Sequence, residues 1–381
     1  MATAALPRTA REIRLAARPE GLPERAHFAV AEAPVPEPGP GQVLVRNRHF
    51  LVFPGLLTLI GGAVEGLPLP PLHAGDTLFG PAVGEVVAAP AGSPLRPGAL
   101  VSHLLGWREY ALVDAAACTP LDDTLPDPVA YLAQGSAPYG ALTRLAGIRP
   151  GDTVLVTGAA GAVGTLAGQT ARLLGAGRVI GTTGSPEKAE RLVAELGYDT
   201  VLLRGTGRPI AEQLAGAAPA GIDVLVDTVG GEQLAAALGA ARQGARFALV
   251  GALSAQLAPG RAGGGPPVEP VGIDPFRLVV RGISVRGYLG SEHPDVEEEW
   301  TGRFGAWLRS GGIRFPHVRI PGIDRAPQAL RELAEGRHFG AVVVELADQA
   351  VSFGSCRQDP KETAWPGRRA VDTGVARDAD R

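Results

Sequence analysis

Short apolar runs dominate the first third of the chain. Between about residues 11 and 138 apolar and polar positions alternate at period two, as in "QVLVRNRHFLV", "VGEVVAAP" and "REYALVD", and Pro or Gly residues separate the runs. This pattern is typical of β-strands joined by turns. We therefore predict a β-rich domain over residues 11–138, preceded by a loose tail at residues 1–10.

The pattern of apolar and polar positions changes near Tyr139. The stretch "DTVLVTGAAGAVGTLAGQTARLLGA" has the pattern of a strand, a glycine turn and a helix, and "RVIGTTGS", "PEKAERLVAELGY" and "IDVLVDTV" continue the alternation. Such alternation indicates a doubly wound parallel sheet of the Rossmann type, so we predict an α/β domain over residues 139–295. The β pattern returns in "HVRIPG" and "AVVVEL", and we expect residues 296–347 to rejoin the first domain. Residues 348–381 lack sustained periodicity, which favours a disordered tail.

Composition and charge narrow the class of protein. The 381 residues are 45% hydrophobic and 20% charged, and the net charge is -3, so the basic surface typical of a nucleic-acid-binding protein is absent. Two cysteines fit a reducing compartment better than a disulfide framework. The first residues lack the apolar core of a signal peptide, and the most apolar early stretch is interrupted by Pro54 and Glu65. These features predict a soluble cytoplasmic protein with no membrane partner.

The glycine turn is the strongest candidate for a binding motif. In "VLVTGAAGAVG", Gly158, Gly161 and Gly164 recur at a spacing of three, with Ala159 where the common G-x-G-x-x-G motif has its first glycine. A strand precedes the turn, a helix follows it, and the next strand begins about 20 residues later, as the motif requires. We expect Gly161 to let a pyrophosphate approach the backbone, and Gly164 to let the helix pack closely on the sheet.

The residues after the next strand bear on the choice of dinucleotide. An NAD site carries Asp or Glu there, whereas this chain has Thr182, Thr183 and Ser185, followed by Lys188. Lys188 is one of only two lysines in the chain, the other being Lys361. Hydroxyls and an ammonium would bind a 2′-phosphate that a carboxylate would repel, so NADPH is the predicted cofactor. The alternative interpretation is that Lys188 is a solvated surface residue.

These segments together resemble the zinc-independent medium-chain dehydrogenases/reductases, and most closely their NADPH-dependent alkenal/one oxidoreductases, the prostaglandin reductases. The resemblance covers about residues 11–346 and rests on "VLVTGAAGAVGTLAGQTARLLGAGRVIGTTGSPEKAERLVAELGYD", "DVLVDTVGGEQLAAAL", "ARFALVGALS" and "HFGAVVVEL". It implies a GroES-like β-barrel domain beside the Rossmann domain, with nicotinamide and substrate between them. It also implies a homodimer formed through the edge of the Rossmann sheet.

The resemblance assigns cofactor contacts to particular positions. Those facing the pyrophosphate are Gly161, Ala162, Val163 and Gly164. Gly184, Ser185 and Lys188 match the 2′-phosphate segment, and Arg204 is either a second phosphate clamp or an exposed residue. Those along the nicotinamide are Val229, Gly251, Ala252 and Leu253. His338 replaces an asparagine that faces the cofactor in the family.

The substrate side departs from the family pattern. The segment that usually carries a tyrosine and an arginine reads "VFPGLL", and the stretch after the nicotinamide loop, "LSAQLAPG", also lacks its tyrosine. Tyr139 and Tyr288 are the tyrosines nearest the expected cleft, and each is either a proton donor or a packed junction residue. The apolar "FPGLLTLIGG" suggests a hydrophobic substrate, and the Arg-, Ala- and Gly-rich composition suggests bacterial secondary metabolism.

Three functions remain open from the sequence. The first is an NADPH-dependent reductase of activated carbon–carbon double bonds in a hydrophobic enone or enal. The second is a quinone oxidoreductase, and the third is an NADP-binding protein with a non-redox role such as cyclisation or sensing. No metal is expected, because Cys118 and the scattered histidines supply no three-ligand spacing for catalytic zinc.

Overall fold

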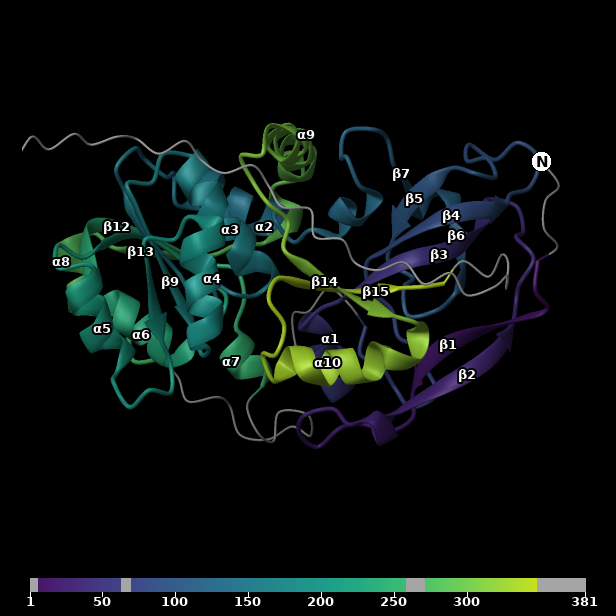
Figure 1. The fold of residues 1–381 in the computed structure, drawn as a ribbon, viewed down its shortest axis with the longest axis horizontal. Coiled ribbons are helices and arrows are strands. Elements are labelled where there is room, and N and C mark those ends of the chain that lie inside the picture. Colours follow the sequence, from purple (N-terminus) through teal and green to yellow (C-terminus); the bar gives the residue numbers. More distant parts are fainter. Residues whose placement is uncertain (1–5, 63–69, 258–270, 348–381) are drawn as a thin grey trace, which may run out of the picture. The chain divides into compact units, whose positions relative to one another are not determined.

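The computed structural model describes residues 6–62, 70–257 and 271–347, and Figure 1 shows its fold. The described residues up to 347 belong to one compact unit by their contacts, so the domain boundaries at 138 and 295 stay a prediction. The tail expected at 348–381 lies outside the described residues. The first strand begins at Thr9, inside the segment expected as a loose N-terminal tail.

The N-terminal residues build β-structure, as their period-two pattern predicts (Figure 1). The elements are β1 (Thr9–Leu15), β2 (Phe28–Pro34), β3 (Gln42–Val52), α1 (Gly55–Gly61), β4 (Ala82–Ala88), β5 (Leu100–His103), β6 (Tyr110–Asp114) and β7 (Thr119–Pro120). β1 and β2 pair as an antiparallel ribbon. A seven-stranded sheet has the order β14-β15-β3-β4-β5-β7, and β6 also pairs with β3.

Two strands of that sheet come from the other end of the described chain. They are β14 (His317–Pro321) and β15 (Ala341–Glu345), which flank α10 (Ala326–Ala334). β15 pairs antiparallel with β3, with Val342 opposite Val52 and Glu345 opposite His49. Val342 and Val344 are buried in one cluster with Ile13, Phe50 and Trp107, so burial on the sheet, rather than local pattern, fixes where this segment docks.

The middle of the chain forms a six-stranded parallel sheet with the order β10-β9-β8-β11-β12-β13. The fold class predicted from the sequence, a doubly wound parallel sheet with a β domain, is confirmed. The strands and the helices between them are β8 (Thr153–Val156), α3 (Ala162–Leu173), β9 (Arg178–Thr183), α4 (Pro186–Leu196), β10 (Thr200–Leu203), α5 (Ile210–Ala217), β11 (Ile222–Asp227), α6 (Gly231–Gly239), β12 (Ala241–Leu249), α7 (Leu253–Gln256), α8 (Pro275–Arg281) and β13 (Ser284–Gly287).

Alternate residues of the central strands feed two hydrophobic clusters. Val154 and Val156 of β8 pack in one cluster with residues of α3 and α4. Leu155, between them, packs in another cluster with residues of α5 and α6. Side chains of a strand point alternately to its two faces, so these helix pairs cover opposite faces of the sheet.

Two further helices frame the junction between the β-structure and the parallel sheet. They are α2 (Ser136–Gly140), which continues into a π-helical turn at Ala141–Leu145, and α9 (Asp295–Ser310). Short 3-10 turns occur at Arg25–His27, Ala115–Ala117, Pro128–Leu132, Gly290–Glu292 and Ile323–Arg325.

Candidate cofactor site and the neighbouring junction

The glycine turn between β8 and α3 has the geometry that a phosphate-binding loop needs. Gly158 has φ +60°, a conformation that favours glycine. A Cβ on Gly164 would lie 2.4 Å from the carbonyl oxygen of Gly158, so only glycine lets the helix approach the turn this closely. Gly161 is exposed at the start of α3 and cannot cap the helix, because it has no side chain. The amides of the first turn, at Ala162, Val163 and Gly164, therefore suit an anion.

A buried threonine shapes the turn from within. The Thr182 hydroxyl accepts from the Gly158 amide at 3.1 Å and donates to Gln233 Oε1 at 2.5 Å. Its carbonyl accepts from the Ala159 amide at 2.9 Å. Thr182 is fully buried, so its hydroxyl supports the turn instead of facing a 2′-phosphate, which differs from the sequence-based expectation.

The loop after β11 is organised by Asp227, which the sequence analysis missed. Its Oδ1 accepts from the Thr157 hydroxyl at 2.5 Å and from the amides of Val229 and Gly230 at 3.0 Å each. Asp227 is 1% exposed, and a carboxylate buried this deeply must satisfy its oxygens locally. An acid directly after the apolar run "VLV" of the strand "IDVLVD" is the sequence signal that could have found it.

The expected nicotinamide residues lie on that loop and on the end of β12. Val229 is 7% exposed, and its carbonyl accepts from the Ser254 hydroxyl at 2.6 Å. Gly251 and Ala252 are exposed, and the amide of Leu253 donates to the Thr228 carbonyl at 3.0 Å. The carboxyl ends of β11 and β12 are thus brought together, at the edge where open α/β sheets bind ligands.

The end of β9 carries cationic and hydroxyl groups but no carboxylate. Ser185 caps α4, since its Oγ accepts from the Lys188 amide at 3.3 Å. Arg204, at the end of the adjacent strand β10, is exposed, and a Cβ on Gly184 would lie 3.5 Å from its guanidinium. Gly184, Ser185 and Arg204 therefore lie together beside the start of α4.

The side chain of Lys188 reaches a loop about 150 residues away in sequence. Its Nζ donates to the carbonyl of Gly336 and, at 2.6 Å, to that of His338. Burial lowers the pKa of this ammonium. An ammonium has three donors, so these two bonds leave one N–H for another acceptor.

His338 contributes its carbonyl to that contact, while its ring lies against α10. The ring Nε2 lies 3.0 Å from Glu332 Oε2, and burial lowers the pKa of the imidazole. The asparagine that His338 replaces faces the cofactor in the resembled family, but here the ring faces a carboxylate.

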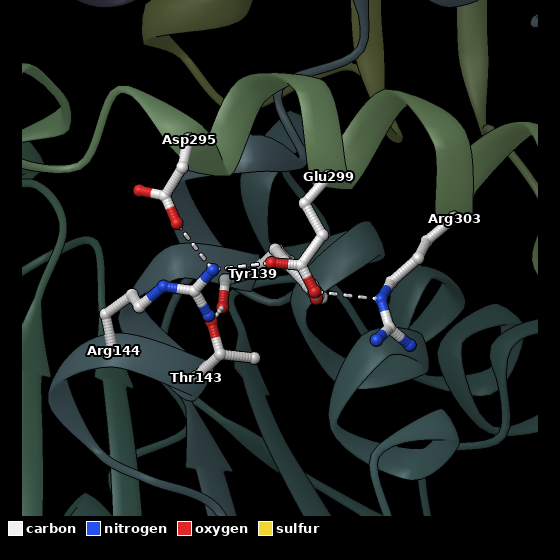
Figure 2. Close-up of polar contacts among 6 residues, drawn as sticks. All are labelled: Tyr139, Thr143, Arg144, Asp295, Glu299 and Arg303. Atoms are coloured by element: carbon white, nitrogen blue, oxygen red, sulfur yellow. Dashed lines mark hydrogen bonds and ion pairs between the residues drawn. The ribbon is translucent and has the colours of Figure 1, made fainter.

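The two candidate tyrosines lie in different surroundings. Tyr139 is 1% exposed, and its ring lies 5.9 Å from that of Trp300 and 6.4 Å from that of Trp307. Its hydroxyl donates to Glu299 Oε1. Figure 2 shows how Arg144 and Arg303 complete the network around Glu299, with Arg144 also 2.9 Å from Asp295. These contacts favour the packing role for Tyr139, and its catalytic role stays an untested prediction.

Tyr288 follows β13, at the carboxyl edge of the sheet. Its amide donates to the carbonyl of Leu249 at 2.8 Å, which places it beside the strand end that leads into Gly251. Its ring stacks on His293 at 5.6 Å, and a Cβ on Gly140 would lie 2.2 Å from its hydroxyl oxygen. Within the described ranges this hydroxyl has no hydrogen-bond partner, and burial raises its pKa.

The segment expected to line the substrate site is mostly core. Leu56, Leu59 and Ile60 of α1 are at most 1% exposed and pack in the main cluster of the β-structure. Residues 63–69 lie outside the described residues. The hydrophobic-substrate prediction therefore gains no direct support from these side chains.

Two further features of the described ranges bear on the sequence-based expectations. They hold no group of three or more His, Cys, Asp or Glu side chains that could bind a metal ion. None of their helices combines the length and the apolar character needed to cross a bilayer.

Comparisons with known proteins agree with this architecture. Residues 162–304 match the family described as zinc-binding dehydrogenase, and residues 11–121 match the N-terminal domain of oxidoreductase. YfmJ of Bacillus subtilis (strain 168) is 32% identical over 88% of this chain and 98% of its own. The NADPH-dependent curcumin reductase of Escherichia coli (strain K12) is 30% identical over 87% of this chain and 96% of its own. The solved structure of CurA with NADPH from Vibrio vulnificus has a TM-score of 0.79 at 28% identity, covering 89% of this chain and 100% of that one.

Proposed function

Because the chain belongs to the medium-chain dehydrogenase/reductase superfamily, as an NADP(H)-dependent oxidoreductase related to the curcumin and prostaglandin reductases, we propose that it reduces the activated carbon–carbon double bond of a hydrophobic α,β-unsaturated ketone or aldehyde. The observation that carries the proposal is the open carboxyl edge of the parallel sheet. There, the glycine turn and the ends of β9 and β12 bring together small residues and the backbone amides of an uncapped helix start, which suit a dinucleotide.

The residues at this edge fit NADPH. Gly164 lets α3 approach the glycine turn more closely than a Cβ would allow, and the first turn of α3 offers amides for the pyrophosphate. Lys188 and Arg204 supply positive charge where a carboxylate would select NADH. Val229 and Gly251 are the groups that would flank the nicotinamide.

When bound, the cofactor supplies a hydride for the β-carbon of the substrate. Negative charge then develops on the substrate's carbonyl oxygen, and the α-carbon needs a proton. Tyr288 is the better-placed of the two tyrosines, because its hydroxyl has no hydrogen-bond partner within the described ranges and it lies beside the strand end that leads to Gly251. Its raised pKa keeps the hydroxyl protonated at neutral pH. We assign it to donate a hydrogen bond to that oxygen.

The substrate class rests on what the cleft segments lack. Val52–Leu57 carries neither the tyrosine nor the arginine of the resembled reductases, so small polar enals would find few partners. Curcumin, on which one relative acts, is a large molecule whose double bonds are conjugated to carbonyls. A bulky apolar enone is therefore the proposed substrate, and a quinone is the second candidate.

A panel of substrates tests the proposal. NADPH consumption, followed at the absorbance of the reduced nicotinamide, should be fastest with a bulky apolar enone, slower with quinones and slowest with small enals. NADPH deuterated at the transferred position should deliver its label to the β-carbon. NADPH binding without turnover on any enone or quinone would reject the reductase and favour the non-redox alternative.

An apolar surface beside the edge strand β13 supports the homodimer. Four residues on or next to α8 are large, apolar and at least 45% exposed: Ile273, Phe276, Val279 and Val280. β13 pairs only with β12 among the described strands. An unpaired edge beside an exposed apolar helix suits a second copy of the chain. Phe276→Glu should shift the protein to monomer in sedimentation, while an unchanged mass would count against this interface.

A further inference from the structure

A short segment between α10 and β15, residues 336–340, lies along the nucleotide-binding elements; we call it the strap. At one end its carbonyls, those of Gly336 and His338, accept from Lys188 Nζ. In the middle, the guanidinium of Arg191 lies 4.0 Å from the ring centroid of Phe339. At the other end, the Gly340 amide donates to the Ala160 carbonyl at 2.9 Å. The strap thus contacts both the start of α4 and the glycine turn.

The conformation of the strap is fixed by its surroundings. Phe339 is 5% exposed and packs in the cluster that contains Leu192 and Leu196 of α4. Gly340 has φ +82°, and a Cβ there would lie 2.0 Å from the Pro316 carbonyl oxygen, so only glycine fits. Because Phe339 and Gly340 are held, the carbonyls next to them have a defined position relative to α4.

A lysine side chain has many rotamers, and fixing it on a ligand costs conformational entropy. Here the Lys188 side chain is already ordered before any ligand binds, since two of its three ammonium donors are bonded to carbonyl oxygens of the strap. The third donor is left for an anion at the start of α4, which Ser185 caps.

We propose that the strap is a positioning element for Lys188, and that it sets the preference for NADP(H) over NAD(H). This inference rests on the proposed role of Lys188 at the 2′-phosphate. It adds that the β-structure, through the segment that leads into β15, takes part in cofactor choice.

A matched pair of glycine variants tests the strap. Gly336 has φ +68° and Gly311, at the end of α9, has φ +72°, and each would have nothing within 4 Å of an added Cβ. A valine is strained at either position, so the backbone must move locally in both variants. Gly336→Val should raise the Kd for NADPH by about three- to tenfold and leave that for NADH unchanged. Gly311→Val should change neither.

Lys188→Met separates the strap from the phosphate assignment. It should raise the Kd for NADPH by about tenfold to hundredfold, the value of a charge-assisted hydrogen bond, and leave NADH binding nearly unchanged. Hydrogen exchange of the cofactor-free protein should also become faster at the Gly340 amide, because the strap loses its anchor at Gly336.

The outcomes are distinguishable. If the ratio of the Kd values for NADPH and NADH is unchanged in Lys188→Met, both the assignment of Lys188 to the 2′-phosphate and the proposed role of the strap would be overturned. If Lys188→Met loses the preference for NADPH over NADH but Gly336→Val and Gly311→Val bind NADPH equally well, the proposed role of the strap alone would be overturned. Unchanged exchange at Gly340 in Lys188→Met would show that the ammonium does not hold the strap.

Discussion

The carboxyl edge of the parallel sheet and the junction between α2 and α9 use polar groups in opposite ways. At the sheet edge, the residues of the glycine turn are small, and Gly161 and Arg204 are exposed. At the junction, Tyr139, Glu299 and Arg144 satisfy one another (Figure 2). A binding region is marked by polar groups that the protein itself has not satisfied, and a tyrosine in a plausible sequence position is a weaker sign.

The pKa values of Glu299 and Tyr139 also indicate that the junction contact is structural. The hydrogen bonds from Tyr139 and Arg144 lower the pKa of Glu299 to about 2. Burial, together with the hydrogen bond to Glu299, raises the pKa of Tyr139 to about 12. At neutral pH the Tyr139 proton is therefore held firmly against a carboxylate that does not take it up, which suits a structural contact better than proton transfer to a substrate.

The largest effect should come from the glycine turn. Gly161 has an extended backbone and its nearest contact for an added Cβ is at 3.4 Å, so Gly161→Val should fold. Its branched side chain would stand where we propose that the pyrophosphate meets α3, and NADPH affinity should fall by more than about a hundredfold. Fluorescence titration measures this loss. Gly216→Val, on the open surface of α5, is the control, and equal affinities in the two variants would mean that the turn binds no phosphate.

Tyr288→Phe should reduce turnover without reducing cofactor affinity. It removes the hydroxyl assigned to the substrate oxygen, and kcat should fall by about 10- to 100-fold, less than a full general-acid contribution because water can substitute in part. Steady-state kinetics with a bulky enone and an NADPH titration measure the two quantities. An unchanged kcat would return Tyr288 to a packing role.

Tyr139→Phe should reduce the stability of the protein and leave turnover nearly unchanged. Loss of a hydrogen bond to an ionised carboxylate should lower the free energy of unfolding by about 1.5–3 kcal/mol, while kcat/KM stays within about twofold. Urea denaturation and the same enone assay give both numbers. A large drop in kcat at full stability would instead place Tyr139 in the reaction.

The acid stability of the protein should depend on Glu299. Because the folded pKa is lowered to about 2 from an ordinary value near 4.5, the unfolded state binds more protons between these pH values. The stabilisation is present above about pH 4.5 and is lost as the pH falls toward 2. Glu299→Gln should therefore flatten the decline of Tm between pH 5 and pH 3, and an unaltered slope would mean that the pair with Tyr139 is not formed in solution. The effect should be modest, since the Glu299 side chain is 33% exposed.

The smallest expected effect is that of a chelator. No three-ligand group for catalytic zinc is found in the sequence or among the described residues, so EDTA should leave NADPH-dependent turnover unchanged. Activity lost to EDTA and restored by zinc would reveal ligands at positions outside these ranges.

Much of the nucleotide-binding half could be predicted locally. A strand, a glycine turn and a helix are adjacent in sequence, and Gly164 is required by a contact only six residues away, at Gly158. The end of β9 and the loop after it, "GTTGS", carry no carboxylate, and this too can be read from the sequence. Asp227 was missed because its only sequence signal, an acid after the apolar run of "IDVLVD", is weaker than a spacing motif.

The sequence by itself determined the alternation of strands and helices, the glycine turn and the residue types around it, since short-range sterics and periodicity control these features. Tertiary structure alone decided what the side chains of Tyr139 and Lys188 contact. Tyr139 meets Glu299 across 160 residues, and Lys188 meets the strap across 150. The partner of Tyr139 depends on how two helices pack, and the partners of Lys188 are backbone carbonyls. Because every residue has a backbone carbonyl, residue types in the sequence do not identify these partners.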